Sequence, residues 1–281
     1  MVKLIRPNQC IVSLLISVFV FAQELEFRVI ESIPFPEDTK LLDLNPNKLN
    51  WSINNSFLLL DEEKNQLFSL EPPDNLNLSP ISGLENSLYG QLIWMGLAPD
   101  GFRVVDRLEN EILFLDHRLN LIQRINIEPS LYPDMVAISQ QGILYMYSQS
   151  YNSIFSFDRL KININPLIDF KRKRLDSDCI IDISTNHLGE IAILNCQNKV
   201  MLFSQNGKLK SLFSIILSEP SHIVSIKDDW FLFNAQGKAT STKTMMQYTI
   251  PETSVPVIDV ESMGKLIAIL SSDHILIIHA N

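Results

Sequence analysis

The chain has 281 residues, of which 46% are apolar and 20% are charged, so it can bury a large core and is not generally disordered. Its 23 Lys and Arg residues are outnumbered by 32 Asp and Glu residues, and the resulting net charge of −9 is spread along the chain. This acidity argues against nucleic acid and anionic lipid as partners.

The first 22 residues have the pattern of a secretory signal peptide. Lys3 and Arg6 precede the apolar run Ile11–Ala22, which ends in small residues that suit a cleavage site. A helix of this run would be about 18 Å long, too short for a hydrocarbon core of about 30 Å. We therefore expect residues 1–22 to be removed on export to the periplasm or extracellular space. Residues 23–281 would then form a single domain without a transmembrane segment, and an uncleaved N-terminal anchor is the alternative.

Short apolar runs separated by polar turns fill the rest of the chain, without long amphipathic helical patterns. The turn asparagines Asn65, Asn110, Asn152 and Asn198 recur at intervals of 45, 42 and 46 residues. A unit of this length with about four strands has the size of one propeller blade, and about 259 residues accommodate six. We therefore predict an all-β, six-bladed β-propeller. A β-sandwich or a two-domain β protein is the alternative, but neither explains the regular period.

Each repeat is expected to start with an apolar strand next to the central channel. These strands are Leu49–Ile53, Leu92–Leu97, Met135–Ser139, Ile180–Ser184, Ile223–Ile226 and Val257–Val260. The last repeat reaches the C-terminus after only three strands. The spare strand Leu25–Ile30 can lie beside His274–His279 as the missing outer strand, which closes the ring and removes its open sheet edges.

Asparagine is expected to take the place of glycine in many turns. Only 9 glycines serve about two dozen turns, whereas the chain has 22 asparagines, and Asn tolerates left-handed backbone conformations. In Asp61–Asn65 and Asp106–Asn110 an acidic residue closes the second strand and the following turn ends in Asn. In this pattern the chain resembles the NHL-type β-propeller repeat, although two other repeats lack the acidic residue. The resemblance implies a six-bladed ring with a ligand face at one end, and no chemistry.

Two cysteines remain after the leader. Cys179 and Cys196 flank a predicted hairpin and face each other if its turn is centred between His187 and Leu188. A shift of one residue would place them on opposite faces, so a disulfide and two buried free thiols both stay open. The absence of CxxC motifs and Cys–His clusters argues against structural zinc and thioredoxin-type chemistry.

Loop placement gives the main functional prediction. In a propeller, the connections from a fourth strand to the next first strand lie on the same face as the turns between second and third strands. In this chain these connections hold 8 of the 14 prolines. These long connections are residues 31–38, 79–90, 128–133, 171–178, 217–221 and 251–256. Loops grouped at one end of a rigid scaffold usually form the binding surface. We expect a monomer that binds a protein, small molecule or glycan through this long-loop face, unless the loops are merely longer connections.

Few side chains stand out as candidates for the site. Trp51 and Trp94 lie on predicted first strands and could stack on a ligand in the channel, with core packing as the competing interpretation. The dense basic run consists of Lys171, Arg172, Lys173 and Arg174. This run could dock an acidic partner or could simply form an exposed, protease-sensitive loop.

Catalytic motifs are absent. The sequence has no HExxH, nucleophile elbow, P-loop or GxGxxG, so no catalytic residue, metal ligand or cofactor is predicted. The acidic turns Asp61–Glu63 and Asp106–Glu109 could bring carboxylates near the axis, although solvated turn charge explains them as well. We predict a non-catalytic binding propeller. The alternative is a calcium-dependent hydrolase, lactonase or lyase with a carboxylate site in the central channel.

Overall fold

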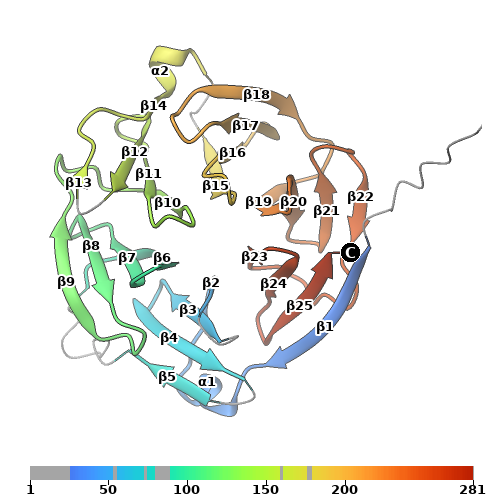
Figure 1. Cartoon of the computed structure of the whole chain (residues 1–281). Helices are drawn as coiled ribbons and strands as arrows, with labels where there is room; N and C mark the ends of the chain where they lie inside the picture. Colours follow the sequence, from blue (N-terminus) through green and yellow to red (C-terminus); the bar gives the residue numbers. More distant parts are fainter. Residues whose placement is uncertain are drawn as a thin grey trace, which may run out of the picture.

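Six antiparallel sheets surround a central axis in the computed structural model (Figure 1). The structure describes residues 26–52, 56–72, 75–79, 89–158, 161–175 and 179–280, so the predicted signal peptide lies outside the described residues. The prediction of an all-β, six-bladed propeller is confirmed. Within the described ranges, no helix is long and apolar enough to cross a bilayer.

Blades 1 to 3 follow one another along the chain, each with its first strand nearest the axis. Blade 1 consists of β2 (Lys48–Trp51), β3 (Phe57–Asp61), β4 (Gln66–Glu71) and β5 (Asn75–Leu78). Blade 2 consists of β6 (Leu92–Ala98), β7 (Gly101–Asp106), β8 (Glu111–Leu115) and β9 (Leu121–Asn126). Blade 3 consists of β10 (Met135–Ile138), β11 (Leu144–Ser148), β12 (Ser153–Asp158), β13 (Lys161–Ile162) and β14 (Ile168–Asp169).

Blades 4 to 6 continue the ring, and the two short helices of the described residues lie on its outside. Blade 4 consists of β15 (Ile180–Thr185), β16 (Ile191–Asn195), β17 (Lys199–Phe203) and β18 (Leu209–Ser214). Blade 5 consists of β19 (Pro220–Ile226), β20 (Asp229–Asn234), β21 (Lys238–Ser241) and β22 (Gln247–Thr249). Blade 6 consists of β23 (Asp259–Met263), β24 (Leu266–Leu270), β25 (His274–Ala280) and β1 (Phe27–Pro34). The helices are α1 (Glu37–Leu41) and α2 (Phe170–Lys173).

The N-terminal strand completes the last blade. β1 runs antiparallel to β25, from Phe27 opposite Ala280 to Pro34 opposite His274, and forms the outer edge of blade 6 (Figure 1). The predicted closure of the ring is therefore confirmed. The strand is longer than predicted, because the buried side chain of Ile33 packs toward blade 1 and keeps residues 31–34 in the sheet. These four residues were expected in a loop.

The first strand of blade 6 was also misplaced from sequence. The prediction gave Val257–Val260, whereas β23 starts at Asp259. The amide of Val257 donates a hydrogen bond of 3.0 Å to the carbonyl of Ala235 in blade 5, so this residue belongs to the connection between the two blades.

The core is divided among the interfaces between blades. Each of the six apolar clusters joins one pair of adjacent blades, for example Leu58 of blade 1 with Val104 of blade 2. All residues of β3, β7, β11 and β16 are buried, because neighbouring blades cover both faces of these second strands. This burial explains why β3, β11 and β16 appear in the sequence as nearly continuous apolar runs instead of alternating patterns.

The repeated asparagines take the left-handed conformation expected of them. Asn65, Asn110, Asn152 and Asn198 have φ angles of 52°, 56°, 49° and 56°. Each follows a second strand at the turn toward the third, where a residue with a larger or branched side chain would be strained. The asparagines therefore perform a role that glycine usually has.

The acidic residues that precede these asparagines are structural. Asp106 accepts hydrogen bonds from the amides of Glu109 (3.1 Å) in its own turn and Gly90 (2.6 Å) in the long connection before β6. Asp61 likewise accepts from the amides of Lys64 (3.0 Å) and Asn45 (2.8 Å). Asp61 and Asp106 are only 1% and 0% exposed, so the interpretation as solvated turn charge is wrong for both. Their bonds hold the turns and the long connections on one face.

Cys179 and Cys196 are joined by a disulfide in the structure, with Cα atoms 5.6 Å apart. The pairing of Thr185 with Ile191 centres the hairpin on Leu188, which by itself would put the cysteines out of register. A bulge between Ile180 and Asp182 shifts the register by one residue and brings the two cysteines opposite each other.

Candidate functional site

One residue from each innermost strand surrounds the mouth of the channel. Bulges in β6, β15 and β19 precede Trp94, Asp182 and His222, and a bulge re-aims the side chains beside it. The other three residues occupy the equivalent positions of β2, β10 and β23, as judged by their pairing with the second strand of each blade. We call the six half-buried residues the mouth ring; they are Lys48, Trp94, Met135, Asp182, His222 and Asp259.

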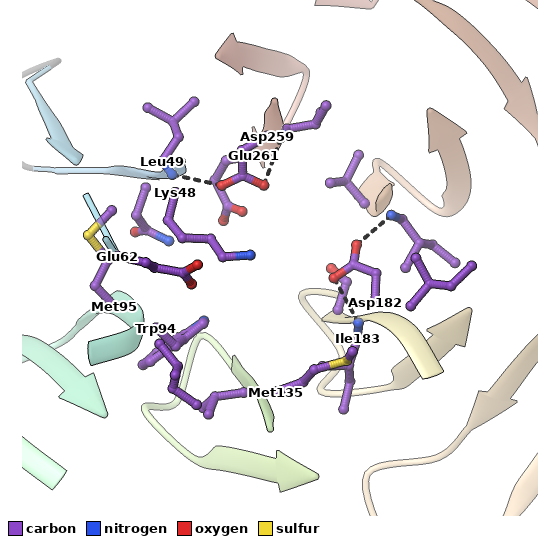
Figure 2. Close-up of a pocket in the computed structure, with 18 of the residues that line it drawn as sticks. Lys48, Leu49, Glu62, Trp94, Met95, Met135, Asp182, Ile183, Asp259 and Glu261 are labelled. Atoms are coloured by element: carbon purple, nitrogen blue, oxygen red, sulfur yellow. Dashed lines mark hydrogen bonds between the residues drawn. The ribbon is translucent and has the colours of Figure 1, made fainter. Parts of the chain in front are cut away.

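A cavity of about 330 Å³ lies at this mouth (Figure 2). Five of the six mouth-ring residues line it, together with Glu261 from the next inward position of β23. Glu62 from the β3–β4 turn and Asp134 from the connection before β10 also reach it. These two positions place the cavity on the long-loop face, where the sequence predicted a ligand.

The two mouth-ring aspartates connect adjacent blades. Asp259 accepts a hydrogen bond of 2.7 Å from the amide of Leu49 in blade 1, and Asp182 accepts one of 2.7 Å from the amide of Ile223 in blade 5 (Figure 2). Each also accepts from the amide of its own following residue. These bonds fix both carboxylates at the edge of the cavity, so their positions do not depend on a ligand.

Burial changes the protonation of the carboxyl groups. It raises the pKa of Asp182 to about 7, although the amide of Ile223 and the charge of Lys48 lower it. Burial also raises the pKa of Glu261 well above its ordinary value, and the charges of Asp259 and Asp182 raise it further. The channel thus contains carboxyl groups that can hold a proton near neutral pH.

The basic groups respond in opposite ways. Burial lowers the pKa of Lys48, but the charges of Asp259, Glu62 and Asp182 outweigh this effect and raise it. Burial lowers the pKa of His222 more strongly than Asp259, whose Oδ1 lies 3.6 Å from its Nδ1, raises it. The mouth ring therefore favours a charged Lys48 and a neutral His222.

The two tryptophans proposed from sequence lie at opposite ends of the channel. Trp94 is half-buried and lines the mouth cavity, whereas Trp51 is only 5% exposed and packs on Phe57 with ring centroids 4.9 Å apart. Trp51 also borders a second cavity of about 340 Å³, at the end with the short turns between first and second strands. Only Trp94 is thus positioned to contact a ligand at the long-loop mouth.

The basic run lies far from the channel in the ring. Residues 171–173 belong to α2 on the outer edge of blade 3 (Figure 1), so the expected loop is partly helical. Asp169 caps this helix by accepting from the amide of Arg172 at 2.8 Å. All four basic side chains are exposed, and the structure does not bring them to either cavity.

Sequence reasoning missed most of the mouth ring. Lys48 directly precedes one predicted first strand, and Asp182 and Asp259 interrupt two others; these charges next to or within apolar runs were the available signal. Their shared position became visible only with the strand register. Among the described residues, no group of three or more His, Cys, Asp or Glu side chains is arranged to hold a metal ion.

Comparison with known proteins supports the fold. No family model and no curated protein matches the sequence. Virginiamycin B lyase from Staphylococcus aureus matches with a TM-score of 0.64 at 13% identity, over 90% of this chain and 99% of that chain. YCF48 bound to D1 peptide gives 0.56 at 11% identity over 84% and 78%, and BBS1N in complex with ARL6DN gives 0.55 at 9% over 91% and 97%. These similarities show a β-propeller whose structural neighbours include a lyase and two partner-binding proteins.

Proposed function

We propose that this protein is an exported, non-catalytic binding propeller that holds a small ligand at the long-loop mouth of its channel. The observation that carries the proposal is the mouth cavity of about 330 Å³, lined by half-buried polar residues from the innermost strands. Pockets for small ligands commonly have volumes of about 300 to 1,000 Å³ and contain a few fixed polar groups. Export rests on the leader sequence alone, and NHL-type repeats remain part of the hypothesis.

The arrangement of the charged groups supports binding. Burying charge is costly unless it is paired or hydrogen-bonded, and the fold holds Lys48, Asp182 and Glu261 around one cavity. If the channel only needed to be filled, apolar side chains would line it at a lower cost in free energy. Because propellers of this shape serve both lyases and partner-binding proteins, the site and not the fold supports this proposal.

A screen of melting temperatures tests the proposal. Sugars, amino acids, nucleotides and organic acids would be tested with the purified protein, and each stabilising compound retested on Lys48→Met and Lys227→Met. Lys227 is exposed at the opposite mouth and serves as the matched control. We expect stabilisation to disappear in Lys48→Met and to persist in Lys227→Met. Stabilisation that survives in Lys48→Met, or none in the whole panel, would contradict the proposal.

A second candidate function is hydrolase or lyase chemistry in the same channel. The pKa of about 7 at Asp182 favours it, because a carboxyl group that titrates near neutral pH can act as a general acid or base. A calcium-dependent form of this chemistry predicts that saturation at 100 times Kd adds about 2.7 kcal/mol of stability. Melting curves with calcium and with EDTA measure this change, and superimposable curves would argue against the calcium-dependent enzyme.

A further inference from the structure

Lys48 is a cation without a direct partner among the described residues of the mouth cavity. Figure 2 shows its amine directed toward the open centre, with Asp259 and Glu261 on one side and Asp182 across the cavity. Its ammonium group makes no hydrogen bond and no ion pair with any residue that the structure describes, although nearby carboxylates influence its charge. A half-buried ammonium group in this position can accept an anionic group of a ligand.

Glu261 is the complementary acidic group. It comes from β23, beside β2 in the ring, yet its carboxyl group has no hydrogen-bond or ion-pair partner in the described part of the chain. Asp182 lies across the cavity with both oxygens already accepting from backbone amides, and its carboxyl group adds negative charge whenever it is ionised. The carboxyl groups outnumber the ammonium group of Lys48, and a cationic group of a ligand would favour their ionised forms and be attracted to them.

Neither charge alone explains the lining. A ligand with only an anionic group would lie near the carboxyl groups without a cation to offer them. A ligand with only a cationic group would compete with the ammonium group of Lys48 for the same carboxyl groups. We propose that the mouth cavity binds a small zwitterion, with the ligand's carboxylate on Lys48 and its ammonium group on Glu261 and Asp182. This proposal rests on the proposed function and specifies the class of ligand.

The remaining wall of the cavity indicates what the rest of the ligand is. Trp94 and Met135 contribute apolar side chains from blades 2 and 3. A volume of about 330 Å³ is at the small end of the range for ligand sites. An amino acid or dipeptide with an apolar side chain fits this combination of charge, polarity and size.

Matched analogues test the zwitterion with the unmodified protein. L-leucine carries both charges, L-leucinamide lacks the carboxylate and N-acetyl-L-leucine lacks the ammonium group. Leucyl-leucine distinguishes a dipeptide from a free amino acid as the source of the same chemistry. By isothermal titration calorimetry, we expect L-leucine or leucyl-leucine to bind at least tenfold more tightly than either singly charged analogue. An analogue that binds as tightly as the zwitterion would overturn the proposal.

Variants then assign the two charges. Lys48→Met should remove the preference over L-leucinamide, and Glu261→Gln should weaken the preference over N-acetyl-L-leucine. Lys227→Met should leave both preferences unchanged. If both preferences persist in both mouth variants, the assignment is wrong. If these probes do not bind but another compound requires Lys48, the zwitterion fails while the proposed function stands; if no compound requires Lys48, both fail.

Discussion

The two ends of the channel have similar volumes and different chemistry. The cavities measure about 330 and 340 Å³, and both include Asn50, Ser184 and Glu261. At the long-loop mouth Lys48, Asp182 and Asp259 are half-buried on strands, whereas Lys227 and His187 at the opposite mouth are exposed on turns. Exposed charges are well solvated and mobile, while charges fixed on strands keep their orientation. The comparison teaches that fixed charge, and not volume, distinguishes the candidate site.

Bulges account for part of this difference. They occur in β6, β15 and β19 near the long-loop end of the innermost strands, and each precedes a mouth-ring residue. Toward the opposite end the same three strands pair regularly with their neighbours. The propeller thus combines a regular scaffold with local irregularity at one end, where bulges can re-aim individual side chains.

The largest expected effect is on the pH dependence of stability. The folded-state pKa of Asp182 is raised from 3.8 to about 7, so the folded protein retains a proton that the unfolded chain releases. This contribution is fully present below about pH 4, is lost as the pH rises through about 7, and is on the order of 4 kcal/mol in full. Glu261, with its raised pKa, acts in the same direction.

Urea unfolding at pH 4, 5.5 and 7 measures this dependence. His222, whose pKa is lowered, opposes it, so the informative quantity is the difference between the unmodified protein and Asp182→Asn. We expect the variant to lose less stability than the unmodified protein over this range. Lys227→Met at the opposite mouth should keep the original slope, and an identical slope in Asp182→Asn would show that Asp182 is not protonated in the folded state.

A smaller effect is expected from the bonds between blades. Asp259→Ala leaves the buried amide of Leu49 without its acceptor and should reduce the free energy of unfolding by about 2 kcal/mol. The matched control at the opposite mouth is Ser262→Ala, which removes a 2.7 Å bond to the carbonyl of Ser225 and should cost about 1 kcal/mol. Chemical denaturation measures both losses in the free energy of unfolding. Equal losses would show that the hydrogen bonds between blades contribute equally at the two ends of the channel.

The contribution of Trp94 should be smaller again. Trp94→Ala removes an aromatic face that can contact a ligand cation or an apolar group, and a loss of about 1 to 2 kcal/mol corresponds to roughly tenfold weaker binding. Calorimetry with any ligand that requires Lys48 measures this change. Met263→Ala provides the control, because Met263 is 44% exposed at the opposite mouth. Equal weakening by both variants would place the ligand deeper in the channel.

Replacement of the exposed basic run should have the smallest effect. Changing Lys171–Arg174 to serine removes charges that lie outside both cavities, so stability should stay within about 0.5 kcal/mol and mouth binding should be unchanged. Unfolding and calorimetry test this expectation. If an acidic partner docks on α2, the same variant should lose that partner in a pull-down from the intact protein. Loss of ligand binding at the long-loop mouth would instead show that the basic run on the outer edge of blade 3 influences the channel.

The sequence predicted the ring because its evidence was local and repeated. Asn65 and its equivalents marked a regular period, and the unpaired strand near residue 27 matched the missing edge of blade 6. The position of β23 was less accessible, since Val257 continues an apolar pattern but bonds to blade 5. Apolar periodicity alone does not show where a connection ends and a strand begins.

The site was less predictable for a related reason. Lys48, Asp182 and Asp259 are far apart in sequence and meet only because six strands share one register around the axis. A single bulge both aligns Cys179 with Cys196 and places Asp182 at the mouth. Such one-residue shifts depend on contacts between strands, so a hydrophobic pattern does not reveal them.

The pairing of β1 with β25 constrains the order in which the molecule can fold. Blades 1 to 5 are built from consecutive strands and can form one after another along the chain. The sixth blade joins segments from the two extremes of the domain, so it forms only when the chain as far as Ala280 is available. Contacts of such large sequence separation form slowly. A prematurely terminated chain consequently leaves β1 without its neighbour, in a state suited to recognition by chaperones or proteases.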